Sequence, residues 1–220
     1  MDYSYIDLFC GAGGLSAGFN RAGFQNVFSV EFNPEFAKTY RRNFPSHKLL
    51  VEDICDISNE RIKELIGDKE VDVIIGGPPC QGFSIAGNIG RTFIDDERNK
   101  LFKEFVRFVN EIKPKMFIME NVAAVATHLK GRTIKTIVDA FEHAGTGYKV
   151  KWEVLNTVNY EIAQERRRIV IVGIRLDLNT EFEYPIQSQN IKTIKDVIGD
   201  LPRLSSGEQS SIPNHNAMAH

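Results

Sequence analysis

The stretch Val71-Asp72-Val73-Ile74-Ile75-Gly76-Gly77-Pro78-Pro79-Cys80-Gln81-Gly82-Phe83-Ser84 organises this chain. Its first five residues form a short apolar run, which predicts a buried strand of a parallel sheet. Two glycines end the strand, and two prolines then restrict the backbone, because each ring fixes φ and limits the residue before it. A stiff turn therefore presents Cys80 at the carboxyl end of a strand, where open α/β sheets bind their ligands.

Cys80 has two interpretations. A free cysteine is often a small buried hydrophobe that packs in the core. Glycine and proline, rather than packing residues, surround Cys80, so we favour a nucleophilic thiol. The other cysteines, Cys10 and Cys55, are far away in sequence, and no Cys/His spacing typical of zinc is present. An odd number of cysteines in an intracellular chain predicts reduced thiols, and we expect no bound metal.

Apolar runs and helical patterns alternate along the chain, which predicts βαβ units and a mostly parallel α/β sheet. The expected strands are residues 5–10, 27–31, 49–51, 71–75, 116–119, 148–155 and 169–174. The expected helices are residues 15–22, 33 or 34–43, 58–66, 99–112, 134–144 and 193–200. No helical pattern separates the last two strands, so we expect an antiparallel edge strand there.

Length and charge limit the functions that we consider. The 220 residues suffice for one sizeable core, and no apolar run approaches the ~20 residues of a membrane span. The N-terminus lacks the basic region of a secretory signal. The formal net charge is only −2, whereas nucleic-acid binders are typically basic. Any DNA contact therefore requires local positive charge, or charge from another domain or chain.

The turn Gly11-Ala12-Gly13-Gly14 follows the first expected strand and precedes a helix, as in nucleotide-binding sites. Glu31 lies twenty residues after Gly11, at the end of the second strand, where an acid can bind ribose hydroxyls. Ser16 occupies the position where a dinucleotide fingerprint has a third small residue, which disfavours NAD. A tight turn without any ligand is the other alternative.

Two motifs resemble the cytosine-5 DNA methyltransferases. Pro79-Cys80-Gln81 resembles the family's catalytic motif, and its continuation Gly82-Phe83-Ser84 is associated with the enzymes that act on DNA. Residues 7–14, Asp-Leu-Phe-Cys-Gly-Ala-Gly-Gly, resemble the first motif, which binds S-adenosylmethionine. The resemblance covers about residues 4–176. It implies a Rossmann-like methyltransferase fold, with a catalytic domain over residues 1–176 and a connecting segment over residues 177–220.

The resemblance also implies a set of cofactor-binding residues. Those expected to bind S-adenosylmethionine are Phe9, Gly11, Gly13, Glu31, Phe32, Asp53, Ile54, Pro79 and Leu101. Glu31 would bind the ribose hydroxyls and Asp53 the adenine amino group, with Ile54 beside it. Phe32 would pack on adenine, at a position where the family often has tryptophan. Taken singly, the two acids would more often be strand-end caps or solvated carboxylates, but their placement at successive strand ends favours a shared site.

The implied chemistry involves Cys80, Glu120, Arg166 and Arg168. The thiolate adds to carbon 6 of cytosine, so that carbon 5 becomes nucleophilic enough to accept a methyl group. Glu120, in Glu-Asn-Val, would donate to ring nitrogen 3, since negative charge develops on the ring. In Gln-x-Arg-x-Arg, Arg168 would contact the cytosine carbonyl and Arg166 the surrounding network. The alternatives are an ion pair of Glu120 with Arg98 or Lys100 and a solvated basic run.

The target base must leave the DNA duplex to reach Cys80. Residues 85–97 have no helical or strand period, and we expect them to form a loop that closes over the flipped cytosine. Arg91 and Arg98 have phosphate-binding or structural roles that the sequence does not separate. The base that removes the carbon-5 proton is not identifiable from the sequence.

Residues 193–202 resemble the family segment that precedes target recognition, but the recognition region and the C-terminal motifs are not present. We therefore expect a fragment or one subunit of a split enzyme, with weak or no methylation by itself. The predicted function is DNA cytosine-5 methylation within a microbial restriction–modification system, in the cytoplasm and on the nucleoid. The alternatives are a tRNA cytosine-5 methyltransferase, a non-catalytic cofactor-binding subunit and, more remotely, an NAD dehydrogenase.

Overall fold

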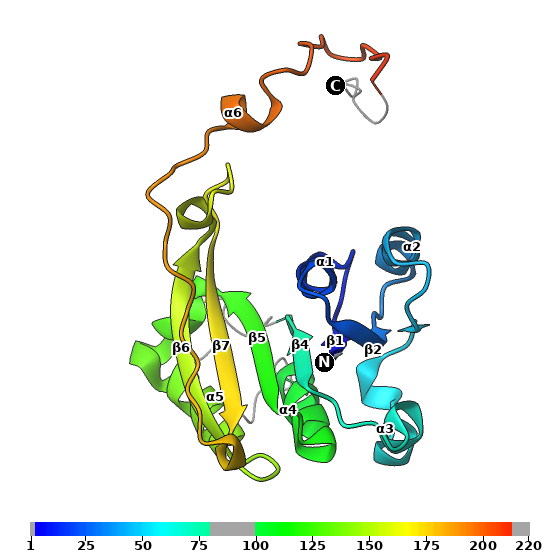
Figure 1. Cartoon of the computed structure of the whole chain (residues 1–220), viewed down its shortest axis with the longest axis vertical. Coiled ribbons are helices and arrows are strands. Elements are labelled where there is room, and N and C mark those ends of the chain that lie inside the picture. The colour runs from blue at the N-terminus through cyan, green and yellow to red at the C-terminus, as the bar shows by residue number, and fades with distance from the viewer. Residues whose placement is uncertain (1–2, 80–99, 213–220) are drawn as a thin grey trace. The chain divides into compact units, whose positions relative to one another are not determined.

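The computed structural model describes residues 3–79 and 100–212, so the predictions for Cys80 and for residues 85–97 lie outside the described part. Within it, one sheet has the strand order β3-β2-β1-β4-β5-β7-β6 (Figure 1). The strands are β1 (Ser4–Leu8), β2 (Gln25–Val30), β3 (Leu49–Leu50), β4 (Val73–Gly76), β5 (Met116–Val122), β6 (Tyr148–Asn156) and β7 (Arg167–Arg175). The α-helices are α1 (Gly14–Arg21), α2 (Pro34–Asn43), α3 (Asn59–Ile66), α4 (Lys100–Ile112), α5 (Arg132–Glu142) and α6 (Ile194–Ile198).

The predicted mostly parallel sheet is confirmed. β1 pairs in parallel with β2 and β4, and β4 pairs in parallel with β5. β7 runs antiparallel to β5, from the pair Met116↔Ile174 to the pair Val122↔Arg168. Because β1, β2, β4 and β5 are parallel, the loops that follow them emerge at one edge of the sheet.

Side chains alternate between the two faces of the central strands. Ile6 and Leu8 on β1 belong to a large core cluster with residues of α3, α4 and α5. Tyr5 and its neighbours on β4, Val73 and Ile75, pack instead against residues of α1. Helices therefore cover both faces of the sheet, which explains why its central strands are nearly continuous apolar runs.

Several element ends differ from the sequence prediction. β1 ends at Leu8 rather than at residue 10, because Phe9 has a left-handed φ of 59°. β4 starts at Val73 rather than at residue 71, and the Asp72 carboxylate accepts hydrogen bonds from the Ser4 backbone and the Lys115 ammonium. β5 continues to Val122, three residues beyond the predicted end, because β7 pairs with it along that whole length.

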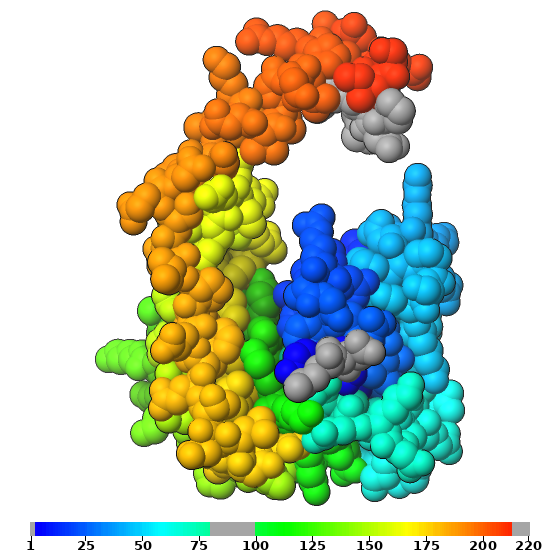
Figure 2. Space-filling model, viewed as in Figure 1, coloured from blue at the N-terminus to red at the C-terminus, as the bar shows by residue number. Residues whose placement is uncertain are grey.

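The chain forms two compact units. One comprises residues 1–154 and 168–184, and the other comprises residues 155–167 and 185–220. In the first unit the segment after β7 packs on β6 and β7, where Lys151 donates to the Phe182 carbonyl and the Tyr184 hydroxyl donates to the Val170 carbonyl. Figure 2 shows this segment, in gold, at the surface. The domain boundary at residues 176/177 stays a prediction.

In the second unit, α6 begins at a capping box. The Thr193 hydroxyl accepts from the Asp196 backbone, and the Asp196 carboxylate accepts from the Thr193 backbone. Gly199 follows the helix, which is therefore shorter than the predicted 193–200. Among the described residues, no helix is long and apolar enough to cross a membrane.

Stacked aromatic rings fill the core between β5, α4 and α5. The Phe117 and Phe141 ring centroids lie 4.0 Å apart, and Phe105 and Tyr148 meet Phe117 edge-on. Gly173 on β7 faces Phe117 across the strand pair, and a Cβ at Gly173 would lie 2.0 Å from Cε1 of that ring. This strand pair therefore leaves no room for a side chain at residue 173.

We expect Gly173→Ala to lower the free energy of unfolding by about 1–3 kcal/mol, because the added methyl group overpacks the core. Gly18→Ala is the matched control, since a Cβ at Gly18 in α1 meets nothing within 4 Å. Alanine there should raise stability by ~0.5–1 kcal/mol through helix propensity. Urea unfolding followed by circular dichroism measures both changes, and equal effects of the two variants would contradict the packing argument.

Candidate active site

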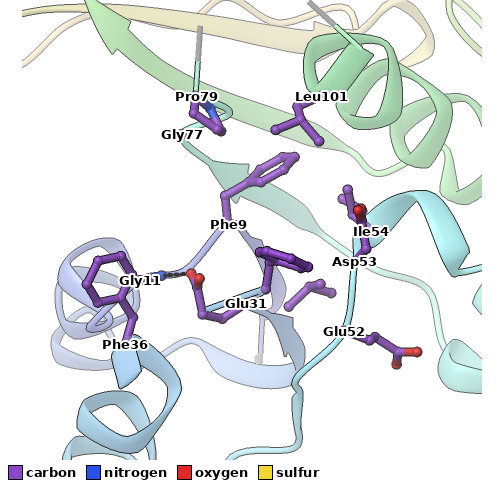
Figure 3. A pocket seen from close by; sticks show the side chains of 12 residues that line it. Phe9, Gly11, Glu31, Phe36, Glu52, Asp53, Ile54, Gly77, Pro79 and Leu101 are labelled. Carbon is purple, nitrogen blue, oxygen red and sulfur yellow. Dashed lines mark hydrogen bonds between the residues drawn. The ribbon is translucent and has the colours of Figure 1, made fainter. Parts of the chain in front are cut away.

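A cavity of about 460 Å³ opens where β1, β2 and β4 end (Figure 3). It lies in the first compact unit and falls in the size range of small-molecule sites. Its lining residues are Phe9, Gly11, Val30, Glu31, Phe32, Phe36, Glu52, Asp53, Ile54, Gly77, Pro79 and Leu101. The structure thus brings together every residue predicted to bind the cofactor except Gly13.

The turn after β1 forms the first wall of the cavity. Phe9 has φ 59°, a conformation that a bulky residue adopts only where the surroundings enforce it. The Cys10 N–H donates to the Val30 carbonyl at 3.0 Å, which ties the turn to the end of β2. In Figure 3 the Phe9 ring points toward Pro79 and Leu101, so it contributes an apolar surface on that side of the cavity.

Glu31, directly after β2, joins the two strand ends. Its Oε2 accepts from the Gly11 N–H at 2.8 Å, and its Oε1 accepts from the Asn33 N–H at 2.7 Å. The residue is only 8% exposed, yet it lines the cavity. A carboxylate has about four acceptor sites, so both oxygens retain capacity for hydroxyl groups of a ligand.

Asp53 lies in the loop after β3 and caps the 3-10 turn η1 (Ile54–Asp56). Its Oδ1 accepts from the Cys55 N–H at 2.9 Å. This backbone hydrogen bond lowers the pKa of the Asp53 carboxyl below its usual value. An ionised acceptor at this wall suits an amino group of a ligand.

Two aromatic rings, Phe32 and Phe36, line the cavity while remaining 70% and 55% exposed. Large exposed aromatic side chains beside a cavity are suited to packing against a planar ligand. Val30, Phe36, Glu52 and Gly77 also line the cavity but were not predicted from the sequence. Phe36 lies in the first turn of α2, close in sequence to Phe32 outside the helix, and this proximity was a signal that could have identified it.

Gly13 is the predicted residue that does not line the cavity. It has φ 93° and precedes α1. A Cβ there would lie 2.2 Å from Cε2 of Phe44 and 3.1 Å from Cδ2 of Tyr40. Gly13 therefore packs against the side chains of α2 and of the residue after it. A direct contact of Gly13 with a cofactor stays a prediction.

A second group of predicted residues lies at the end of β5. Oε1 of Glu120 pairs with Nε of Arg168 on the antiparallel strand β7 at 2.8 Å, and both side chains are partly exposed. A Cβ at Gly77 would lie 3.1 Å from Oε2 of Glu120. Gly77 also lines the cavity, so the cavity wall and the Glu120 carboxylate are direct neighbours.

The Glu120–Arg168 pair differs from the ion pair considered in the sequence analysis. Lys100 was one possible partner there, and the partner in the structure is Arg168.

The extended alternation predicted for residues 164–168 is wrong at Gln164. β7 begins only at Arg167, and Gln164 lies in a bend before the strand.

Arg166 belongs to the second compact unit. Its N–H donates to Oδ1 of Asn156 at 3.3 Å, and its carbonyl accepts from the Thr157 N–H at 3.1 Å. These bonds fix the backbone at the base of the loop between β6 and β7. A side-chain role of Arg166 beside Arg168 stays a prediction, as does the role of Cys80.

Asn121 connects the two strand ends that precede the candidate catalytic residues. It is 5% exposed, and its Nδ2 donates to the Pro78 carbonyl at 3.0 Å. Its Oδ1 accepts from the Val122 N–H at 2.8 Å. Asn121, which directly follows Glu120, thereby fixes the backbone of Pro78, two residues before Cys80.

The sequence profile of the C-5 cytosine-specific DNA methylases matches residues 3–219. The chain belongs to this family. It is 50% identical over its whole length to the Type II methyltransferase M1.HphI of Haemophilus parahaemolyticus and spans 58% of that protein. It is 36% identical to the Type II methyltransferase M.AquIA of Picosynechococcus, covering 98% of this chain and 99% of that protein.

Solved structures show the same fold. A prophage-encoded Escherichia coli protein superimposes with a TM-score of 0.80 and 30% identity, over 96% of this chain and 58% of that one. The methyltransferase EhMeth of Entamoeba histolytica superimposes with a TM-score of 0.69 and 22% identity, over 88% of this chain and 58% of that one. The Rossmann-like methyltransferase fold predicted from the sequence is confirmed. The chain spans about half the length of several curated relatives.

We expect Asn121→Asp to lower the free energy of unfolding by ~1–3 kcal/mol, because the variant keeps the acceptor for Val122 but loses the donor to Pro78. Asn110→Asp, at an exposed position, is the control for the change from amide to carboxylate. Its Oδ1 accepts from the Gly145 N–H at 2.8 Å, and aspartate retains that acceptor. Urea unfolding at neutral pH compares the two variants, and a similar loss in both would show that the Pro78 bond is unimportant.

Proposed function

We propose that this chain is the cofactor-binding and catalytic part of a DNA cytosine-5 methyltransferase from a restriction–modification system, with S-adenosylmethionine as methyl donor. The observation that carries the proposal is the cavity at the strand ends, which adjoins the Glu120–Arg168 pair through Gly77. The family membership and the Type II names of the relatives support it.

The cavity fits S-adenosylmethionine in the chemistry of its walls. Glu31 offers carboxylate oxygens to ribose hydroxyls, and Asp53 offers an ionised acceptor to the adenine amino group. The exposed rings of Phe32 and Phe36 offer apolar surface to the planar base. When bound there, the cofactor supplies an electrophilic methyl group on a sulfonium. The protein's part is to hold that methyl group near the pyrimidine.

In the proposed reaction, the Cys80 thiolate adds to carbon 6 of a flipped cytosine, which makes carbon 5 nucleophilic. Carbon 5 would then take the methyl group of a bound cofactor as the sulfur–methyl bond breaks, with S-adenosylhomocysteine as the leaving group. Negative charge on the ring is stabilised at nitrogen 3 by Glu120 and at the carbonyl oxygen by Arg168. A base removes the carbon-5 proton, and elimination releases the Cys80 thiolate. To donate at nitrogen 3, Glu120 must carry a proton when the base is bound; its partner in the structure is Arg168.

Target recognition is proposed to come from protein outside these 220 residues. The Haemophilus relative is longer than the matched region, whereas the Picosynechococcus relative has nearly the same extent as this chain. The relatives therefore include one protein that is much longer than this chain and one of nearly the same extent. We propose double-stranded DNA as the substrate. That substrate would place the protein in the cytoplasm, on the nucleoid.

The assembly is tested by transfer of labelled methyl groups from S-adenosylmethionine to unmethylated duplex DNA. We expect weak or no transfer by the chain alone, and clear transfer after mixing with the part of M1.HphI that this chain does not match. Cys80→Ala should reduce that transfer by more than about a thousandfold, since no other thiol can replace the nucleophile. Strong sequence-specific transfer by the chain alone would refute the need for a second part, and transfer to tRNA but not to DNA would refute the substrate.

The proposed role of Arg168 is tested in the same assembly. Arg168→Ala should lower the rate of transfer by about 10²–10³, because one donor to the developing charge is lost. Arg167→Ala is the matched control, since adjacent residues of a strand point to opposite faces. Arg167→Ala should leave the rate within about twofold of wild type. Equal losses in both variants would indicate a general effect of positive charge rather than a role at the cytosine.

A further inference from the structure

A buried polar network lies beneath the glycine turn and does not take part in the proposed chemistry. It connects β1, α1, β2, α2 and the loop before β3, which are the elements on one side of the cavity. Its members are Tyr5, Asp7, Ser16, Asn20, Asn26, Ser29, Tyr40 and His47. Polar groups in such a site are costly unless each donor meets an acceptor.

The Tyr40 hydroxyl is the centre of this network. It lies 2.9 Å from Oγ of Ser16, 2.7 Å from Oγ of Ser29 and 2.9 Å from Nδ1 of His47. The Ser16 hydroxyl donates to Oδ2 of Asp7 at 2.6 Å. Ser16 therefore accepts from Tyr40, whose oxygen accepts in turn from Ser29 and from Nδ1–H of His47. Every hydroxyl proton then has one acceptor.

The remaining bonds agree with this direction. Nδ2 of Asn26 donates to Oγ of Ser29 at 3.0 Å, so the Ser29 proton is available for Tyr40. Nδ2 of Asn20 lies 3.0 Å from Nε2 of His47, which must accept there. Burial lowers the pKa of His47, which favours the neutral ring that this pattern requires. Burial also raises the pKa of Tyr40, so its hydroxyl keeps its proton.

The C-terminal part of α2 and the residue after it also contact the glycine turn directly. Nδ2 of Asn43 donates to the Ala12 carbonyl at 2.9 Å. The Tyr40 and Phe44 rings occupy the space where Gly13 lacks a Cβ. Phe36, one turn earlier on α2, lines the cavity. One helix thus forms part of the cavity wall and also holds the turn that supplies the Gly11 N–H to Glu31.

We propose that Tyr40 is a positioning residue of the cofactor site, whose buried hydroxyl fixes the glycine turn and the start of α1 relative to Glu31 and Phe36. Tyr40 itself does not line the cavity and acts through Ser16 and Gly13. This inference rests on the proposed function for its link to S-adenosylmethionine, but the ordering of the turn is measurable without any cofactor.

The test compares Tyr40→Phe with Tyr148→Phe in the 220-residue chain. Tyr148 is likewise buried, and its hydroxyl donates to the Pro114 carbonyl at 2.9 Å on the other side of the sheet. Both variants lose a buried hydroxyl, so melting temperatures report their general destabilisation. Amide hydrogen exchange of residues 11–17 reports the turn, where the Gly13 and Ala17 amides bond to carbonyls of the turn.

We expect Tyr40→Phe to accelerate exchange at Gly13 and Ala17 by about tenfold relative to wild type, with no such change in Tyr148→Phe. Unchanged exchange in Tyr40→Phe, or equal acceleration in both variants, would overturn the positioning role, because the effect would then be absent or merely global. Neither result depends on whether the chain binds a cofactor.

Affinity for S-adenosylhomocysteine, measured by calorimetry, tests the link to the site. We expect about tenfold weaker binding by Tyr40→Phe and unchanged binding by Tyr148→Phe. Wild-type affinity in Tyr40→Phe would overturn the link between the turn and the cofactor. No binding by the wild-type chain would instead count against the proposed cofactor, and would leave the exchange result to decide the positioning role.

Discussion

The hydrogen bonds that Glu31 accepts from the Gly11 and Asn33 backbones hold the site together, because they join the ends of β1 and β2. A carboxylate bound at both oxygens is fixed in place, and its remaining acceptor capacity faces the cavity. The strained turn at Phe9, which ends β1 early, brings the Gly11 N–H within reach. Apart from this pairing and the strand ladder, the Cys10 N–H to the Val30 carbonyl is the bond described between these two strand ends.

A second set of contacts connects the end of β5 with the turn that follows β4. Asn121 binds the Pro78 carbonyl, and the lack of a side chain at Gly77 lets Glu120 approach the cavity wall. The parallel sheet thus places a cofactor pocket and a charged pair side by side, although their residues are distant in sequence. Methyl transfer needs this proximity, because the donor carbon must lie within a few ångströms of the attacking carbon.

Much of this arrangement was predictable from the sequence. The apolar runs and their glycine ends gave the sheet, and acids at successive strand ends indicated a shared pocket, as Glu31 and Asp53 confirm by lining one cavity. The position of Phe36 at the cavity and the packing of Gly13 on Tyr40 and Phe44 were not predicted, because they depend on how α2 packs against the turn. Periodicity reports which residues share a face, but not which neighbour fills that face.

The Glu120–Arg168 pair also could not be predicted from local sequence, and it has a role in the proposed mechanism. Local sequence offered Lys100 and Arg98 as partners, whereas the antiparallel insertion of β7 beside β5 brings in Arg168 from far along the chain. While no base is present, the Glu120 carboxylate pairs with Arg168. In the proposed mechanism, a cytosine whose carbonyl oxygen binds Arg168 would compete with Glu120 for that arginine, so this pairing would change as the substrate arrives. The antiparallel strand, an irregularity in an otherwise parallel sheet, is therefore the part of the fold that couples binding to chemistry in the proposed mechanism.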